Sequence, residues 1–126
     1  MGENIRMDSH KLIYHPEVVA RWMKGENIYP IEIEISTSGA CNHRCTFCAV
    51  DYLEYQPVFL NKDIILRDIT KMKDCGLKSV ICSGEGEPLL NKDMPDIANG
   101  IKACGVDVAM SSNGVFWWAR GTFCNR

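Results

Sequence analysis

Three cysteines lie close together in the first half of the chain. Cys41, Cys45 and Cys48 fall within eight residues, on a loop that contains Gly39 and follows an alternating apolar run. Three thiolates on one short loop can each ligate one iron of an iron–sulfur cube and leave the fourth iron without a protein ligand. Structural zinc normally takes four protein ligands, often as two separated pairs. The spacing therefore favours an iron–sulfur cluster, and the alternative is zinc held by the three thiolates with His43 or another cysteine.

Two later stretches also carry residues that can bind a ligand. Residues 83–88 are Ser-Gly-Glu-Gly-Glu-Pro, in which the glycines let a ligand approach the backbone and the carboxylates can hold a cation. Residues 112–114 are Ser-Asn-Gly, a sequence that is also common in turns for conformational reasons alone. For both stretches a tight turn without a binding role is the alternative interpretation.

Taken together, these motifs resemble those of the radical S-adenosylmethionine (SAM) superfamily. The spacing C-x3-C-x2-C, with Phe47 directly before the last cysteine, is similar to the cluster motif of that family. Residues 86–88 are similar to the end of its Gly-Gly-Glu-Pro element, and residues 112–114 to its Thr-Asn-Gly. Glu85 departs from the pattern, because many members have another glycine there. The resemblance covers about residues 30–115.

The resemblance implies specific cofactors and ligands. A [4Fe-4S] cluster would be held by Cys41, Cys45 and Cys48 and would cleave SAM reductively to a 5'-deoxyadenosyl radical that abstracts hydrogen from an unknown substrate. A reductant such as flavodoxin or ferredoxin would supply the electron. The difficult chemistry belongs to the cofactors, while the protein binds, aims and shields them. The resemblance places the SAM contacts at Phe47, Gly84, Gly86, Glu87, Pro88, Ser112 and Asn113.

The composition narrows the class of protein. The 126 residues are 46% hydrophobic and 24% charged with a net charge of −2, and the charges are well mixed, so no basic face for nucleic acid is expected. No apolar run approaches the roughly eighteen residues of a membrane-spanning helix, and no secretion signal begins the chain. An odd number of cysteines, seven, argues against a disulfide-stapled secreted domain. We therefore expect a cytoplasmic protein.

The elements that would position the motifs alternate along the chain. A short helix starting at Pro16 is expected to precede the core and to pack across one end of it, with Trp22 as a core anchor. Apolar residues then recur every second residue in some stretches and at helical spacing in others, which predicts that strands and helices alternate along the chain. A loop at residues 49–60 is expected to cover the cluster. The predicted core elements span residues 31–36, 63–75, 78–83, 93–104 and 107–112.

A weak internal repeat supports this alternation. Lys-Asp-Cys-Gly-Leu at residues 73–77 matches Lys-Ala-Cys-Gly-Val at residues 102–106, at an offset of 29 residues. An offset of this size suits one βα unit and predicts a parallel sheet. The expected fold is therefore α/β, a partial TIM-like barrel of about three parallel βα units of a radical SAM core, with the site at the C-terminal ends of the strands.

The predicted organisation has three parts. Residues 1–29 would form a lead-in with a short helix, residues 30–115 the partial core, and residues 116–126 an irregular tail. Three βα units are fewer than a radical SAM core contains, so we expect the N-terminal part of a larger enzyme. An inactive truncated fragment and a non-catalytic zinc-binding module are the alternatives to an active enzyme.

Overall fold

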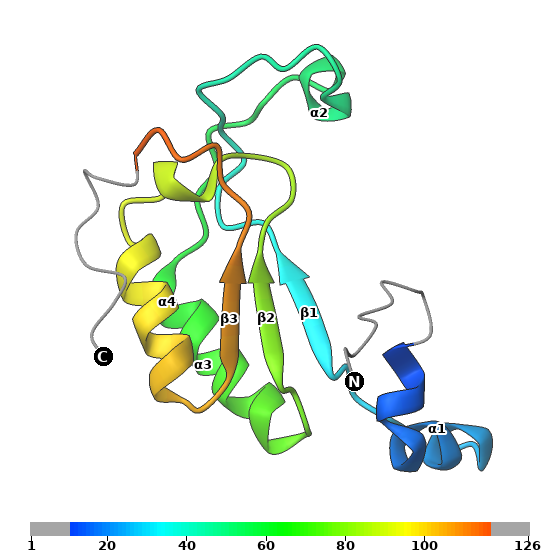
Figure 1. Ribbon diagram of the computed structural model, residues 1–126. Helices are drawn as coiled ribbons and strands as arrows, with labels where there is room; N and C mark the ends of the chain where they lie inside the picture. Colours follow the sequence, from blue (N-terminus) through cyan, green and yellow to red (C-terminus); the bar gives the residue numbers. More distant parts are fainter. Residues whose placement is uncertain (1–10, 117–126) are drawn as a thin grey trace, which may run out of the picture.

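Three parallel strands form the centre of the molecule, in a computed structural model that describes residues 11–116. The strands β1 (Glu32–Ile35), β2 (Ser79–Cys82) and β3 (Asp107–Met110) pair in the order β1-β2-β3. The helices α3 (Lys62–Asp74) and α4 (Met94–Ala103) connect them (Figure 1). The predicted α/β alternation with a parallel sheet is confirmed.

Local sequence explains where the helices begin and end. The Asn61 side chain caps α3 by accepting hydrogen bonds from the backbone N–H groups of Asp63 and Ile64. Gly76 and Gly105 follow the ends of α3 and α4 with φ values of 110° and 78°, the left-handed conformation in which glycine commonly ends a helix. Three or four residues therefore separate the end of each helix from the start of the next strand.

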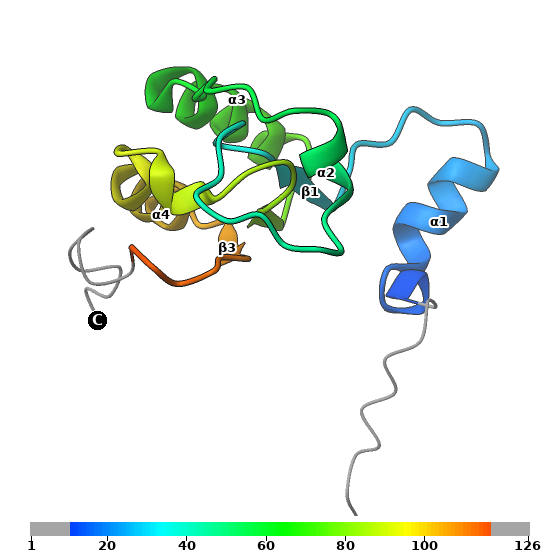
Figure 2. The same cartoon turned by 90° about the horizontal axis from the view of Figure 1, so that it is seen from above.

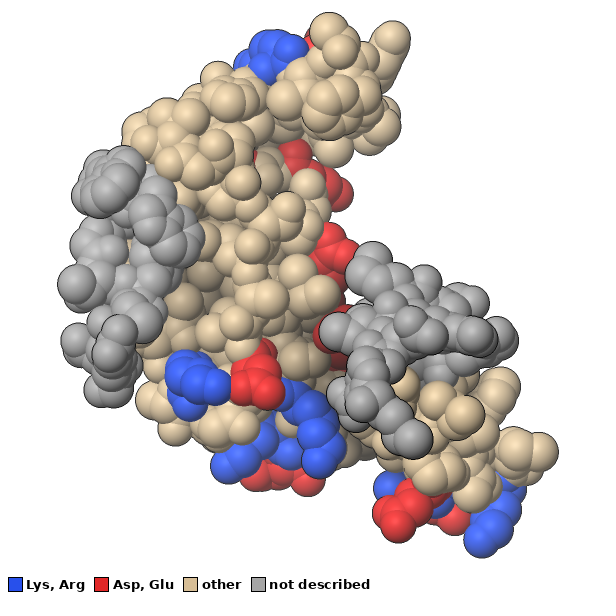
Figure 3. Space-filling model, in the orientation of Figure 1, with Lys and Arg blue, Asp and Glu red and all other residues tan. Residues whose placement is uncertain are grey.

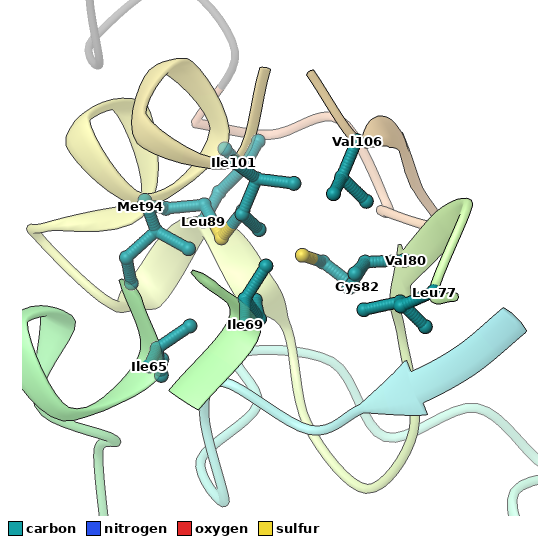
Figure 4. Close-up of a cluster of buried hydrophobic side chains, with 10 residues drawn as sticks. Ile65, Ile69, Leu77, Val80, Cys82, Leu89, Met94, Ile101 and Val106 are labelled. Carbon is teal, nitrogen blue, oxygen red and sulfur yellow. The ribbon is translucent and has the colours of Figure 1, made fainter. Parts of the chain in front are cut away.

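The core lies between the sheet and the two helices. Alternate residues of each strand point to this side, among them Val80 and Cys82 of β2, while α3 and α4 contribute isoleucines (Figure 4). Helices α3 and α4 pack against each other on this one face of the sheet (Figure 2). The buried hydrophobic residues are Ile65, Ile69, Leu77, Val80, Cys82, Leu89, Met94, Ile97, Ile101 and Val106.

The opposite face of the sheet is more open and carries both acidic and apolar side chains. Glu32 and Glu34 of β1 are exposed, as are Asp107 and Ala109 of β3. Figure 3 shows acidic side chains along the edge of the sheet that carries β1. In residues 11–116 the core helices α3 and α4 therefore cover one face of the sheet, which is the arrangement expected for part of a barrel wall.

The N-terminal segment differs from the expectation. A short 3-10 helix, η1 (Lys11–Tyr14), precedes α1 (Pro16–Met23), and no residue of α1 is buried. Trp22 is 61% exposed, so the prediction that it anchors the core is wrong. Helix α1 lies beside the sheet and apart from the core (Figures 1 and 2). After α1 the chain turns at Lys24 and Gly25, and residues 26–31 then lead to β1.

The loop predicted at residues 49–60 contains one helical turn, α2 (Ala49–Tyr52), before it returns to pair Phe59 with Ser38. Within residues 11–116, no helix is long and apolar enough to cross a membrane. The predicted tail lies outside the part of the chain that the structure describes, apart from Phe116, which packs partly against the core.

Candidate functional site

The three sequence motifs meet at one edge of the sheet. Each follows the C-terminal end of a strand: the cysteine loop follows β1, the Gly-Glu-Gly-Glu-Pro loop follows β2, and the Ser-Asn-Gly loop follows β3. Because the strands are parallel, these ends lie side by side (Figure 1, top). This is the edge at which parallel α/β folds build their sites.

The start of the cysteine loop is fixed by buried polar groups. Thr37 and Ser38 are buried, and the Gly39 N–H donates to the carbonyl of Val58 at 2.7 Å. A side chain at Gly39 would collide with the carbonyl oxygen of Gln56, so the close contact between the two segments requires glycine. The loop therefore leaves β1 in a defined direction.

Asn91 is a structural residue that sequence reasoning missed. Its side chain is only 2% exposed and donates to the carbonyls of Thr37 at 2.9 Å and Leu60 at 3.1 Å. It therefore joins the start of the cysteine loop to the end of the segment that returns from α2. An asparagine directly after the short 3-10 helix η2 (Pro88–Leu90) has no sequence signal that separates it from an ordinary turn residue.

The three motif cysteines are half-buried and form no disulfides. The Cys48 N–H donates to the Cys45 carbonyl at 2.9 Å, and the His43 N–H lies 3.4 Å from Cys41 Sγ. Tyr55 places its hydroxyl 3.1 Å from Cys48 Sγ. This hydrogen bond lowers the pKa of the Cys48 thiol and raises the pKa of Tyr55 above its ordinary value. Both directions fit a phenol that donates to a thiolate.

The donor set fits an iron–sulfur cluster, although the thiols do not yet converge. Among residues 11–116, no three His, Cys, Asp or Glu side chains lie close enough together to hold a metal ion. Three free thiols on one anchored loop are nevertheless the ligand type that such clusters use. Metal binding commonly completes the order of its own site, so cluster binding would draw the three sulfur atoms together.

The loop after β2 packs directly on the cysteine loop. The Glu87 N–H donates to the Ala40 carbonyl at 2.8 Å. A Cβ atom at Gly86 would collide with backbone atoms of Ser38 and Ala40. Gly84 adopts φ 113°, where a side chain would be strained and would press on Ser36. Both glycines are therefore required by the contact between the two loops.

The Glu87 carboxylate joins the second loop to the third. It is 3% exposed, and its Oε1 accepts hydrogen bonds from the Leu89 N–H at 3.0 Å and the Ser112 hydroxyl at 2.7 Å. Its Oε2 accepts from the Asn113 N–H at 2.8 Å. Both oxygens are thus engaged with protein donors, and the carboxylate positions the Ser112 hydroxyl and the neighbouring backbone.

The Ser-Asn-Gly loop also reaches the cysteine loop. The Asn113 side-chain amide donates to Asn42 Oδ1 at 2.9 Å, and the Gly114 N–H donates to the Ser112 hydroxyl at 2.9 Å. Three residues predicted to bind SAM, Glu87, Ser112 and Asn113, therefore belong to one hydrogen-bonded unit that includes Asn42. Asn42 is another residue that sequence reasoning did not single out.

Other predicted residues lie apart from that unit. The Phe47 ring is 88% exposed and projects from the cysteine loop. Arg44 is exposed but engaged, because its guanidinium lies 4.7 Å from the Tyr55 ring centroid and 3.2 Å from the Asp51 carboxylate. Arg44 also donates to the Cys41 carbonyl at 3.0 Å. The arginine therefore links both arms of the cysteine loop.

Comparison with known sequences agrees with the motifs. Residues 35–119 match the family model of the Radical SAM superfamily. A stretch of 87 residues is 37% identical to a probable GTP 3',8-cyclase of Saccharolobus islandicus and covers 68% of this chain but 28% of that protein. A GTP 3',8-cyclase of Tolumonas auensis is 35% identical over 88 residues, which cover 65% of this chain and 25% of that protein. The chain thus spans less than a third of the length of these relatives.

Solved structures share the fold. The Streptococcus suis protein SuiB, bound to its precursor peptide SuiA, superposes with a TM-score of 0.65 at 22% identity, covering 91% of this chain and 27% of SuiB. BtrN in complex with AdoMet and 2-DOIA superposes with a TM-score of 0.57 at 16% identity, covering 71% of this chain and 38% of BtrN. At these identities the likeness concerns the arrangement of strands and helices.

Proposed function

Because the chain belongs to the radical SAM superfamily, we propose that its three strand-end loops bind a [4Fe-4S] cluster and SAM and so begin radical chemistry. The observation that carries the proposal is the joining of all three loops by hydrogen bonds. Glu87 connects the second loop to the third through Ser112 and Asn113, and Asn113 connects the third to Asn42 of the cysteine loop. These hydrogen bonds hold the three loops together before any cofactor binds, while the three thiols would converge when the cluster binds.

Cys41, Cys45 and Cys48 would ligate the cluster. Their loop begins at a buried strand end and is pinned by Asn91, so its position relative to the sheet is set. When bound, the cluster supplies the electron that cleaves SAM reductively, and a reductant such as flavodoxin or ferredoxin would replenish it. The thiols are half-buried, which leaves a path for the metal and partial shielding from water.

The second and third loops would hold SAM. The backbone of residues 84–88 stays close to the cysteine loop because Gly84 and Gly86 carry no side chains. Glu87 acts by holding this backbone and that of Asn113 in place, so that peptide groups are presented to the methionine end of SAM. The exposed Phe47 ring offers an apolar surface to the adenine. Exposed Glu85 adds a negative charge near the amino group of SAM.

The three motifs would bind the cofactors, so they do not identify the substrate. The relatives at 35–37% identity are named GTP 3',8-cyclases, which makes GTP the first substrate to test. The matched stretch is about a quarter of those proteins, so substrate turnover by this chain rests on the proposal alone. Three unpaired thiols as cluster ligands would need a reducing compartment, which makes a cytoplasmic location part of the proposal.

The test is anaerobic reconstitution with iron and sulfide. The parent chain is compared with the triple variant Cys41→Ala, Cys45→Ala, Cys48→Ala, and with the matched control Cys75→Ala, Cys104→Ala, which removes two thiols outside the loop. The proposal predicts about four iron atoms per chain in the parent and in the control, and none above background in the triple variant.

Two results would contradict the proposal. Equal iron in the parent and the triple variant would mean that the motif thiols do not hold the metal. Stoichiometric zinc with no iron in the parent, lost in the triple variant, would instead support the zinc-binding module. A far-ultraviolet circular dichroism spectrum of each chain controls for folding.

A further inference from the structure

We propose that Tyr55 is a positioning residue for the cluster, whose hydroxyl donates a hydrogen bond to the sulfur of Cys48 and raises the reduction potential of the metal site. The inference rests on the proposed function, since it concerns the same three thiols. Tyr55 lies seven residues after Cys48, beyond the cluster motif, and neither the motif nor the comparisons assign it a role. It is partly buried, whereas the neighbouring Tyr52 is 90% exposed.

The hydroxyl of Tyr55 is aimed at the cluster ligands. It lies 3.1 Å from Cys48 Sγ, a normal distance for a hydrogen bond to sulfur. A phenol hydroxyl within hydrogen-bond distance of one of the three ligating sulfurs is in position to contact the bound cluster. When Cys48 ligates iron its sulfur carries no proton, so Tyr55 must be the donor.

A clamp of charged residues holds the ring in that position. The Arg44 guanidinium lies over the ring at 4.7 Å from its centroid. Asp51 pairs with Arg44 Nε at 3.2 Å, and Arg44 donates to the carbonyls of Cys41 and His43 at 3.0 and 2.8 Å. The ring is therefore fixed by residues that also shape the cysteine loop. Simple packing would need the ring but would not need the hydroxyl to point at a ligand.

The expected effect follows from charge. One-electron reduction adds negative charge to the cluster and its sulfur ligands, and a hydrogen bond to a ligand sulfur stabilises that charge. Hydrogen bonds to the sulfurs are among the factors that set cluster potentials. Removal of the hydroxyl should therefore make the cluster harder to reduce without removing any ligand.

The experiment compares the parent chain with Tyr55→Phe and the matched control Tyr52→Phe, all reconstituted anaerobically with iron and sulfide. Iron per chain is measured first, and the midpoint potential follows from a redox titration monitored by electron paramagnetic resonance. We expect equal iron in all three proteins, a more negative potential in Tyr55→Phe, and the parent's potential in Tyr52→Phe.

A second measurement keeps the ring and the hydroxyl. Incorporation of fluorinated tyrosine, a stronger hydrogen-bond donor, should move the parent's potential to more positive values and should leave that of Tyr55→Phe unmoved. An unchanged potential in both measurements overturns the inference while the proposed function stands. Loss of the cluster from a folded Tyr55→Phe chain also overturns it, because the residue would then be structural. A parent chain that takes up no cluster contradicts the proposed function and this inference together.

Discussion

Glu87 belongs to a predicted binding motif, yet its carboxylate hydrogen-bonds to neighbouring residues of the protein. Its two carboxylate oxygens accept three hydrogen bonds, from Leu89, Ser112 and Asn113, and almost none of its surface is exposed. A buried carboxylate is tolerated only when its oxygens are satisfied in this way. The residue therefore stabilises the fold and aligns the site at the same time.

Replacement of Glu87 should destabilise the chain. Glu87→Ala leaves the Asn113 and Leu89 donors without their acceptor, which should lower the free energy of unfolding by roughly 2 to 4 kcal/mol. Glu87→Gln keeps one acceptor oxygen and should lower the free energy of unfolding by less. Urea unfolding followed by circular dichroism measures both. The control is Glu34→Ala on the exposed face, expected within about 0.5 kcal/mol of the parent; equal losses at both positions would contradict the assigned role.

Cys82 predicts a dependence of stability on pH. Burial raises the pKa of this thiol from 9.0 to about 11. The unfolded chain loses the proton near pH 9 while the folded chain retains it, so this contribution to stability is complete below pH 9 and is lost as the pH rises to 11. The free energy of unfolding of the parent should fall more steeply across that interval than that of Cys82→Ala. If the free energy of unfolding fell equally with pH in both chains between pH 9 and pH 11, the Cys82 thiol would not be buried as described.

At the scale of elements, the site depends on close contact between loops that follow different strands. The cysteine loop and the loop after β2 touch backbone to backbone at Gly86, and the Ala40 carbonyl accepts the Glu87 N–H there. Neither contact involves a long side chain that can move aside. The separation of the two loops is therefore set by the absence of a single Cβ atom.

Gly86→Ala tests this contact. The added methyl group would collide with Ser38 and Ala40 and force the loops apart, which should cost about 1 to 3 kcal/mol of stability and weaken metal uptake. Thermal unfolding and iron content after reconstitution measure the two effects. Glu85→Ala, an exposed neighbour in the same loop, is the control and should behave like the parent. If Gly86→Ala bound iron as the parent does, the loop contact would not matter to the cluster.

The cap of α3 gives a prediction that is independent of any cofactor. Asn61 accepts hydrogen bonds from two backbone donors, and Asn61→Ala should lower the free energy of unfolding by about 1 kcal/mol. Asn61→Asp retains an acceptor and should stay within about 0.5 kcal/mol of the parent. Chemical unfolding of the three chains provides the comparison, and a harmless Asn61→Ala would exclude a capping role.

Much of the architecture could be predicted from short-range patterns. The alternation of isoleucine and glutamate before the cysteines predicted β1, and apolar residues at helical spacing predicted both core helices. The pairing of β2 with β3 differs from the internal repeat by one residue. Ser79 pairs with Asp107, whereas the repeat offset of 29 residues would pair it with Val108. The repeat aligns helix ends, whereas register is set by which strand face is buried.

The contacts that assemble the site could not be predicted in the same way. Asn91 joins two segments 31 and 54 residues away, and Asn42 meets Asn113 at a separation of 71 residues. Nothing in the local sequence separates these asparagines from turn residues. The same limit explains Trp22, whose helical pattern predicted burial without showing that the core lies out of reach.

At the scale of the whole molecule, residues 11–116 form three parallel strands with core helices on one face, and the other face, which carries acidic and apolar side chains, is more open. The family match covers residues 35–119, and the relatives are three to four times longer than the matched stretch. The chain thus contains the strand ends that carry all three cofactor motifs. The central claim is that these strand ends suffice to hold the cluster and SAM together.

The most direct test is electron paramagnetic resonance of the reduced, reconstituted chain with and without SAM. The triple variant of Cys41, Cys45 and Cys48 serves as the blank. If the loops after β1, β2 and β3 bind both cofactors, SAM will change the signal of the cluster, because it would bind at the iron that the protein leaves open. A cluster signal that is identical with and without SAM would contradict the claim.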